Sequence, residues 1–238
     1  MKRTHPFRKI IATLLIALLY TALTFGILVG VKGYQMYENA ISQMTLEDRV
    51  ESIRGREDFT HYSELTDFYI KAVISAEDHR FMRHSGLDPI AIGRAALRDL
   101  KAGYFKEGGS TITQQLAKNL LFTQEKTVER KAAEIFAVFD IEEEYSMEEI
   151  FELYVNISGF GSGYSGVRAA ALGYFDKEPS ELTDYESAVL AGVPNAPSLY
   201  SPDVSLELAS QRVGEVLGSM VREDVLTQEE ADRIQACH

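Results

Sequence analysis

Residues 108–120 read GGSTITQQLAKNL, the pattern of a helix start followed by an amphipathic helix. Thr111 and Gln114 have the spacing of a capping box, in which each side chain satisfies a free backbone N–H at the start of the helix. An apolar stripe follows at helical spacing, and a polar face lies beside it. The stripe contains Ile112, Leu116 and Leu120, and the polar face contains Thr111, Gln115, Lys118 and Asn119.

The same helical signature recurs along the rest of the chain. From Thr66 onward helical periodicity dominates, and no convincing series of alternating strands occurs. Capping-box spacing is found again at Ser146 with Glu149, Thr183 with Glu186, and Thr227 with Glu230. No linker rich in Gly, Ser or Pro divides residues 61–238. We therefore predict one all-α domain over residues 61–238, preceded by a polar stalk at residues 32–60.

Residues 10–31 form an uncharged run, IIATLLIALLYTALTFGILVGV. At about 1.5 Å per residue, such a helix spans roughly 33 Å, enough for a hydrocarbon core about 30 Å thick. The tail at residues 1–9 carries four basic side chains and no acidic one, which favours a cytoplasmic N-terminus and an extracytoplasmic domain. The alternative is a cleaved signal peptide, whose apolar stretch is usually about 7–15 residues. We expect a single-pass transmembrane helix in the cell membrane.

Charge and cysteine content exclude several classes of protein. The 238 residues include 36 acidic and 24 basic side chains, for a net charge of −12. A general nucleic-acid binder would carry a basic balance, so we expect no nucleic-acid partner. The single cysteine, Cys237, rules out an internal disulfide framework and a cysteine-rich metal site.

The stretch AEDHRF at residues 76–81 contains the first candidate catalytic side chain. Glu77 directly follows the apolar run VISA, so it is expected at the end of a helix beside a polar turn. A partly buried carboxylate crowded by Asp78 can serve as a general base. The alternative is that Glu77 and Asp78 are surface acids paired with His79 and Arg80.

The stretch RKAAEIFAVF at residues 130–139 places a second carboxylate, Glu134, in an apolar run. An unpaired charge is expensive there, and Arg130 lies one turn earlier. The sequence is compatible both with a structural ion pair between Glu134 and Arg130 and with a role of Glu134 in a functional site.

The glycines before Thr111 leave free backbone N–H groups for an anion, although a plain turn and a solvated helix face explain this stretch equally well. Two carboxylates near basic residues are what acid–base glycosyl chemistry needs.

One motif is misleading. Residues 161–166, GSGYSG, match the dinucleotide pattern G-x-G-x-x-G. The segment before them, MEEIFELYVN, has a helical period, whereas the dinucleotide motif requires a buried strand there. We therefore reject a nucleotide site and expect these glycines to make turns and close packing.

Taken in order, these stretches resemble the peptidoglycan glycosyltransferases of family 51, which comprise monofunctional transglycosylases and the N-terminal module of bifunctional penicillin-binding proteins. The resemblance covers residues 66–220. It runs through EDHRFMRHSGLDP, GGSTITQQLAKNL, RKAAE, EEIFELYVN and RAAALGYFDKEPSELTDYESAVLAGVPNAPSLYSP. Because few residues follow Met220, we expect a monofunctional enzyme with no transpeptidase module.

The resemblance implies a lysozyme-like α-helical fold with a membrane-facing jaw at residues 97–122. It implies polymerisation of lipid II, with a lipid-pyrophosphate-linked glycan as donor and the 4-hydroxyl of another lipid II as acceptor. Glu77 would be the general base, and Glu134 would lie near the donor pyrophosphate and assist its departure. The resemblance assigns substrate binding to Thr111, Gln115, Lys118, Asn119, Arg130, Lys131 and Asn156. The expected partners are lipid II, the growing glycan chain, the membrane and other cell-wall synthases.

The chemistry agrees with these roles. A pyrophosphate is already a competent leaving group, so it needs charge stabilisation more than a proton donor. Lys118, Arg130 and Lys131 can supply that charge, alone or with a divalent cation such as Mg²⁺ or Mn²⁺, and no tightly bound cofactor is expected. The acceptor alcohol needs a base such as Glu77. Attack on an α-linked donor to give a β-linked product means inversion in one displacement.

Two alternatives come from other functional classes. A lytic glycan hydrolase on the same scaffold would also need a catalytic glutamate, but the GGSTITQQLAK block and the RKAAE cations favour a pyrophosphate-linked donor. A non-catalytic membrane-anchored scaffold would bind cell-wall precursors without turnover, and the intact Glu77 and Glu134 count against it. Its only support is a set of departures from the family pattern, at His79, Met82, Arg83, Met147, Ser158, Gly159 and Asp176.

Overall fold

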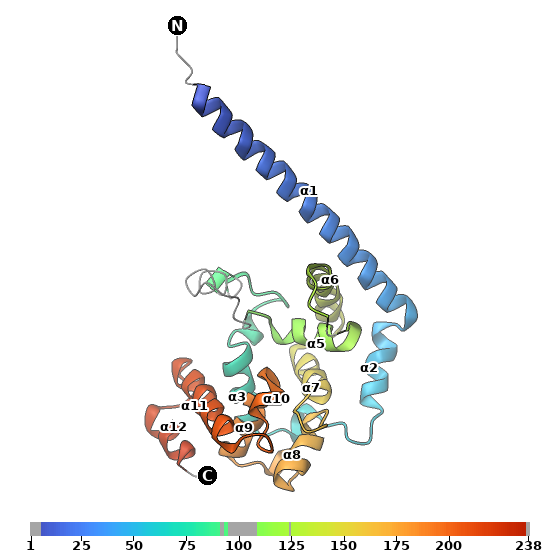
Figure 1. Cartoon of the computed structure of the whole chain (residues 1–238). Coiled ribbons are helices and arrows are strands. Elements are labelled where there is room, and N and C mark those ends of the chain that lie inside the picture. The colour runs from blue at the N-terminus through green and yellow to red at the C-terminus, as the bar shows by residue number, and fades with distance from the viewer. Residues whose placement is uncertain (1–5, 91–92, 95–108, 124, 237–238) are drawn as a thin grey trace.

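The computed structural model describes residues 6–90, 93–94, 109–123 and 125–236, and its regular structure is helical (Figure 1). Within these residues, β-structure is limited to two isolated bridges, between Ser85 and Leu87 and between Gly159 and Ser165. The prediction of an all-α fold is confirmed. The helices are α1 (Pro6–Gln43), α2 (Leu46–Arg54), α3 (Asp67–Glu77), α5 (Ile112–Leu121), α6 (Val128–Glu144), α7 (Met147–Ile157), α8 (Val167–Phe175), α9 (Asp184–Gly192), α10 (Pro197–Tyr200), α11 (Leu206–Arg222) and α12 (Gln228–Gln235).

All four predicted capping boxes form. They start α5, α7, α9 and α12, where a Ser or Thr side chain accepts from the backbone three residues on, and a Gln or Glu side chain returns the bond. In the part of the chain that the structure describes, short 3₁₀ turns link the helices at Tyr62–Glu64, Phe81–Arg83, Pro179–Glu181 and Val193–Asn195. The helix boundaries in the domain therefore follow local sequence signals.

The core lies where α3, α5, α7, α9 and α11 pack together. Its largest fully buried apolar side chains include Phe81, Phe151, Phe160 and Met220. Helix α5 is part of this core, because Ile112 and Leu116 are fully buried and Leu120, the third residue of the stripe, is partly buried. Of the range expected for a jaw, residues 97–108 lie outside the described residues, and residues 112–121 are this core helix.

Helix α1 projects from the domain (Figure 1). Residues 9–43 are long and apolar enough to cross a membrane, and the most apolar part of this stretch is not buried by the rest of the protein. Among the described residues it is the one helix with these properties. This agrees with the predicted membrane-spanning helix.

Residues 32–60 differ from the predicted polar stalk. Helix α1 continues without a break to Gln43, and α2 packs on the domain through the core residues Leu46, Val50 and Ile53. These three side chains recur at helical spacing and give α2 one buried face. Because charged residues lie between these three, the composition of residues 32–60 indicated a polar stalk instead.

The G-x-G-x-x-G stretch forms turns and close contacts, as predicted. It follows α7, which is a helix, and the three motif glycines, at 161, 163 and 166, have positive φ angles of 77°, 85° and 89°. A Cβ on Gly166 would lie 2.9 Å from the backbone oxygen of Asn156. Asp176, one of the departures from the family pattern, ends α8 with a left-handed φ of 54°, a conformation that favours glycine.

Arg49 joins three helices through backbone carbonyls. Its guanidinium donates to Met44 at 3.2 Å, to Ala40 at 3.0 Å near the end of α1, and to Leu120 at 3.1 Å in the last turn of α5. Carbonyls at helix ends lack partners within their own helix, so a cation is well placed there.

We expect Arg49→Met to lower the free energy of unfolding by about 1–3 kcal/mol, because these charge-assisted bonds are lost together. Arg222→Met is the matched control, since the Arg222 guanidinium donates to Ser219 of its own helix at an exposed position. The control is expected to change stability by less than about 0.5 kcal/mol. Denaturant unfolding of the full chain in detergent, followed by circular dichroism, compares the two variants. Equal losses of stability would contradict the role of Arg49 in joining the three helices.

Candidate active site

Glu77 is the last residue of α3, and its carboxylate is held from two sides. Gln115 of α5 donates from Nε2 to Oε2 at 2.9 Å, and Arg212 of α11 donates from Nη2 to Oε1 at 3.4 Å. The Glu77 side chain is only 8% exposed. The surface pairing with His79 and Arg80 is therefore wrong for Glu77, whose partners come from distant parts of the chain.

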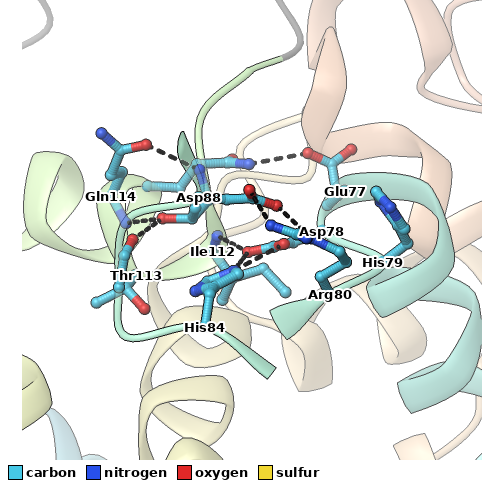
Figure 2. A network of polar contacts seen from close by, with 12 residues as sticks. Glu77, Asp78, His79, Arg80, His84, Asp88, Ile112, Thr113 and Gln114 are labelled. Carbon is cyan, nitrogen blue, oxygen red and sulfur yellow. Dashed lines mark hydrogen bonds and ion pairs between the residues drawn. The ribbon is translucent and has the colours of Figure 1, made fainter. Parts of the chain in front are cut away.

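Asp78 ties the end of α3 to the start of α5. Its carboxylate accepts from the backbone N–H of Ile112 at 3.1 Å, and Nε2 of His84 lies 3.0 Å from both carboxylate oxygens (Figure 2). Both side chains are nearly fully buried. This junction places α5 so that Gln115, one turn further along, reaches Glu77.

A second buried carboxylate, Asp88, lies beside this junction. Arg80 donates to Asp88 from Nε at 2.8 Å and forms a second contact through Nη2. Asp78, His84 and Asp88 present ligand atoms within 4.8 Å of one another, a spacing that suits a metal ion. Because Arg80 already neutralises Asp88, this cluster serves to hold the turn after α3.

Glu134 lies in the middle of α6, and its side chain is fully buried. Arg130 contacts Oε1 through Nη1, and Nζ of Lys131 lies 2.7 Å from Oε2. Lys131 also donates to the hydroxyl of Ser110 at 3.0 Å. The predicted ion pair with Arg130 is confirmed, and a second cation links it to the loop before α5.

Other predicted substrate-binding residues have partners inside the protein. The Thr111 hydroxyl donates to the Gly86 carbonyl at 2.6 Å and caps α5. The Asn156 amide exchanges two 2.8 Å bonds with the backbone of Thr60. Lys118 and Asn119 lie half-buried on α5, one turn beyond Gln115. A direct contact of these side chains with substrate stays a prediction.

Sequence reasoning missed two residues near Glu77. Arg212 is fixed by Glu215 at 2.8 Å and lies over the ring of Tyr200, so its guanidinium is presented to Glu77 in one orientation. Tyr154 of α7 is buried, and burial together with the Glu77 charge raises the pKa of its hydroxyl well above the ordinary value. The sequence assigned neither residue a role, because their proximity to Glu77 arises only when distant helices pack together.

The comparison with family models decides the family. Residues 44–221 match the model described as Transglycosylase, which covers most of the described domain and begins at the end of α1. The chain belongs to the transglycosylase family.

Relatives of this transglycosylase include much longer penicillin-binding proteins. Penicillin-binding protein 1F of Bacillus subtilis is 44% identical over 161 residues, which are 68% of this chain and 22% of the relative. Penicillin-binding protein 1A of Vibrio cholerae is 46% identical over 173 residues, 73% of this chain and 21% of the relative. The match to penicillin-binding protein 1A of Escherichia coli is 44% over 164 residues, 69% of this chain and 19% of that protein. The chain spans about a fifth of the length of these relatives.

A solved structure is also similar. The crystal structure of penicillin-binding protein 1A from Haemophilus influenzae is 32% identical, with a TM-score of 0.37, over 53% of this chain and 16% of that chain.

Substitutions in the transglycosylase separate the two cations of Glu134. We expect Arg130→Met to lower the free energy of unfolding by about 3–5 kcal/mol, because it removes the buried partner of a buried charge. Lys131→Met is expected to cost about 0–1 kcal/mol, since the Lys131 side chain is 47% exposed. Urea unfolding of the two variants measures the difference, and equal losses would contradict this division.

Arg212→Gln tests the second anchor of Glu77. A glutamine still donates a hydrogen bond but lacks the charge and the reach of arginine, so the carboxylate loses its fixed orientation. We expect glycosyl transfer to slow about tenfold or more with the fold intact, because small misplacements of a reacting group are costly. Turnover and thermal unfolding measured side by side check this, and an unchanged turnover would show that Gln115 alone positions Glu77.

Proposed function

We propose that this domain polymerises lipid II into peptidoglycan glycan strands by inverting glycosyl transfer. The observation that carries the proposal is the pair of carboxylates at Glu77 and Glu134, in a chain of the transglycosylase family. Each is shielded from solvent and held by cationic or amide side chains. Helix α5 connects them, because Gln115 contacts Glu77 and the loop before α5 contacts Lys131. Residues 44–221 contain the whole arrangement.

In this proposal Glu77 is the general base. Its carboxylate takes the proton from the 4-hydroxyl of the acceptor lipid II as that oxygen bonds to the anomeric carbon of the donor. The bond from that carbon to the lipid pyrophosphate breaks, and the pyrophosphate leaves with the electron pair. The proton remains on Glu77 until it is released to solvent. The bonds from Gln115 and Arg212 hold the carboxylate ready for this transfer.

Glu134 has a different role, because both of its oxygens are engaged by cations. We assign it the task of orienting Arg130 and Lys131 toward the departing pyrophosphate. We assign Lys118 of α5 to the same task. Fixed positive charge at the place where negative charge develops lowers the activation barrier for departure of the pyrophosphate.

A divalent cation would act with these side chains. Glu134 is a poor ligand for Mg²⁺ or Mn²⁺, since Arg130 and Lys131 already neutralise it. We propose that such a cation is held by the pyrophosphate oxygens of the substrate, and a parallel assay with EDTA shows whether transfer needs it.

Helix α1 suits a substrate whose lipid stays in the bilayer. The basic tail before it favours a cytoplasmic N-terminus, so we propose that the catalytic domain lies outside the membrane. Donor and acceptor then approach the domain by diffusion within the membrane plane.

The deciding test is incubation of the full chain with labelled lipid II. We expect glycan polymers from the unchanged protein and a loss of about 10²–10⁴-fold in rate for Glu77→Gln, because the amide cannot take the proton. Lipid II binding is expected to persist. Glu207→Gln, at an exposed position in the first turn of α11, is the matched control and should retain the full rate.

Other outcomes identify the alternatives. Cleavage of preformed glycan without chain growth would indicate a lytic hydrolase. Binding of lipid II without either product would indicate a scaffold. Full polymerisation by Glu77→Gln would place the base elsewhere.

A further inference from the structure

Helix α6 carries an exposed row of side chains that the proposed chemistry does not explain. Val128, Ile135 and Phe139 are 58%, 38% and 55% exposed. With the half-exposed Lys131 they recur at intervals of three and four residues, so they form one stripe along the helix. We call these four residues the outer stripe. Three large apolar residues and one cation in a row are typical of a helix that lies at a membrane surface.

The neighbouring face of α6 packs on α1. The ring of Phe136 lies 5.3 Å from that of Tyr34 and 6.4 Å from that of Tyr37. Gly33 makes the closest approach, since a Cβ there would lie 2.6 Å from Cβ of Ala132 and 2.9 Å from the backbone nitrogen of Ala133. The two helices therefore meet with no room for a side chain at position 33.

This contact sets the depth of α6. Gly33 is two residues beyond the uncharged run that ends at Val31, a rise of about 3 Å along a helix. Ala132 thus lies near the boundary between hydrocarbon and headgroups when α1 spans a bilayer. In Figure 1, α6 lies on the side of the domain nearest the N-terminal half of α1, and α8 lies on the opposite side.

We propose that the outer stripe lies in the interfacial layer of the bilayer. Its apolar side chains contact lipid, and the ammonium of Lys131 reaches the headgroup level beside Glu134. The occupant is lipid because α6 packs on α1 at Gly33, two residues beyond the uncharged run, whose Leu28 and Val31 are 57% and 51% exposed. This inference rests on the proposed membrane anchor, and it adds that α6 holds a pyrophosphate-binding cation at the depth of the substrate's pyrophosphate.

The chain contains no tryptophan, so one introduced tryptophan reports its own surroundings. The full chain is placed in nanodiscs of phosphatidylcholine with and without brominated acyl chains, which quench nearby indoles. Phe139→Trp tests the outer stripe, and Ile135→Trp repeats the test one turn away. Leu19→Trp in the middle of the span is the positive control, and Leu172→Trp, 42% exposed on α8, is the negative control.

We expect Phe139→Trp and Ile135→Trp to lose emission in brominated nanodiscs, nearly as much as Leu19→Trp, while Leu172→Trp keeps its emission. Quenching of Leu19→Trp alone would overturn the inference and leave the anchor intact. No quenching at any position would overturn both. The lipid II assay is independent of these results, so a failure of the proposed activity is seen separately.

The close approach at Gly33 has its own test in the Phe139→Trp background. Gly33→Ala should reduce the quenching, because the added methyl group pushes α6 away from α1. Gly30→Ala is the matched control, since a Cβ there meets nothing within 4 Å. Equal quenching in the two glycine variants would show that Gly33 does not set the depth of α6 and would contradict that step.

Discussion

The buried carboxylate of Glu134 is the constraint on which the arrangement of this domain depends. A charge with no exposed surface must be compensated before the helices around it can pack. Both compensating cations come from the preceding turn of the same helix, so α6 carries its own neutralised charge into the core. Lys131 then reaches out to Ser110, and the loop before α5 is held against α6. A requirement of burial thereby gathers the positive charge that a pyrophosphate needs.

Glu77, the other carboxylate of the candidate site, is held in another way. Glu77 receives one bond from α5 and one from α11, so its position depends on three helices that meet only in the folded domain. Asp78, the next residue, fixes the start of α5 through a backbone N–H. The two adjacent acids thus have different surroundings. Glu77 is held where three helices meet, and Asp78 fixes the junction that positions it.

Helix α6 connects α1 to the candidate site. One face contacts α1 at Gly33, another buries Glu134, and the outer stripe lies between them around the helix. Because α1 runs without a break from the apolar span into this contact, the domain is held at a set height and orientation.

Local patterns in the sequence determined the helices, their caps, the membrane-spanning run and the Arg130–Glu134 pair. The caps and the ion pair depend on residues within about one turn of one another, and the span depends on one continuous apolar run. The family motifs also marked Glu77 and Glu134 as the carboxylates of interest. Tertiary structure alone decided that Gln115 and Arg212, which are 38 and 135 residues away from Glu77, would be its partners. It also decided that residues 32–54 continue α1 and form α2 against the domain. Such contacts depend on how helices pack, and packing joins residues whose separation along the chain carries no periodic signal.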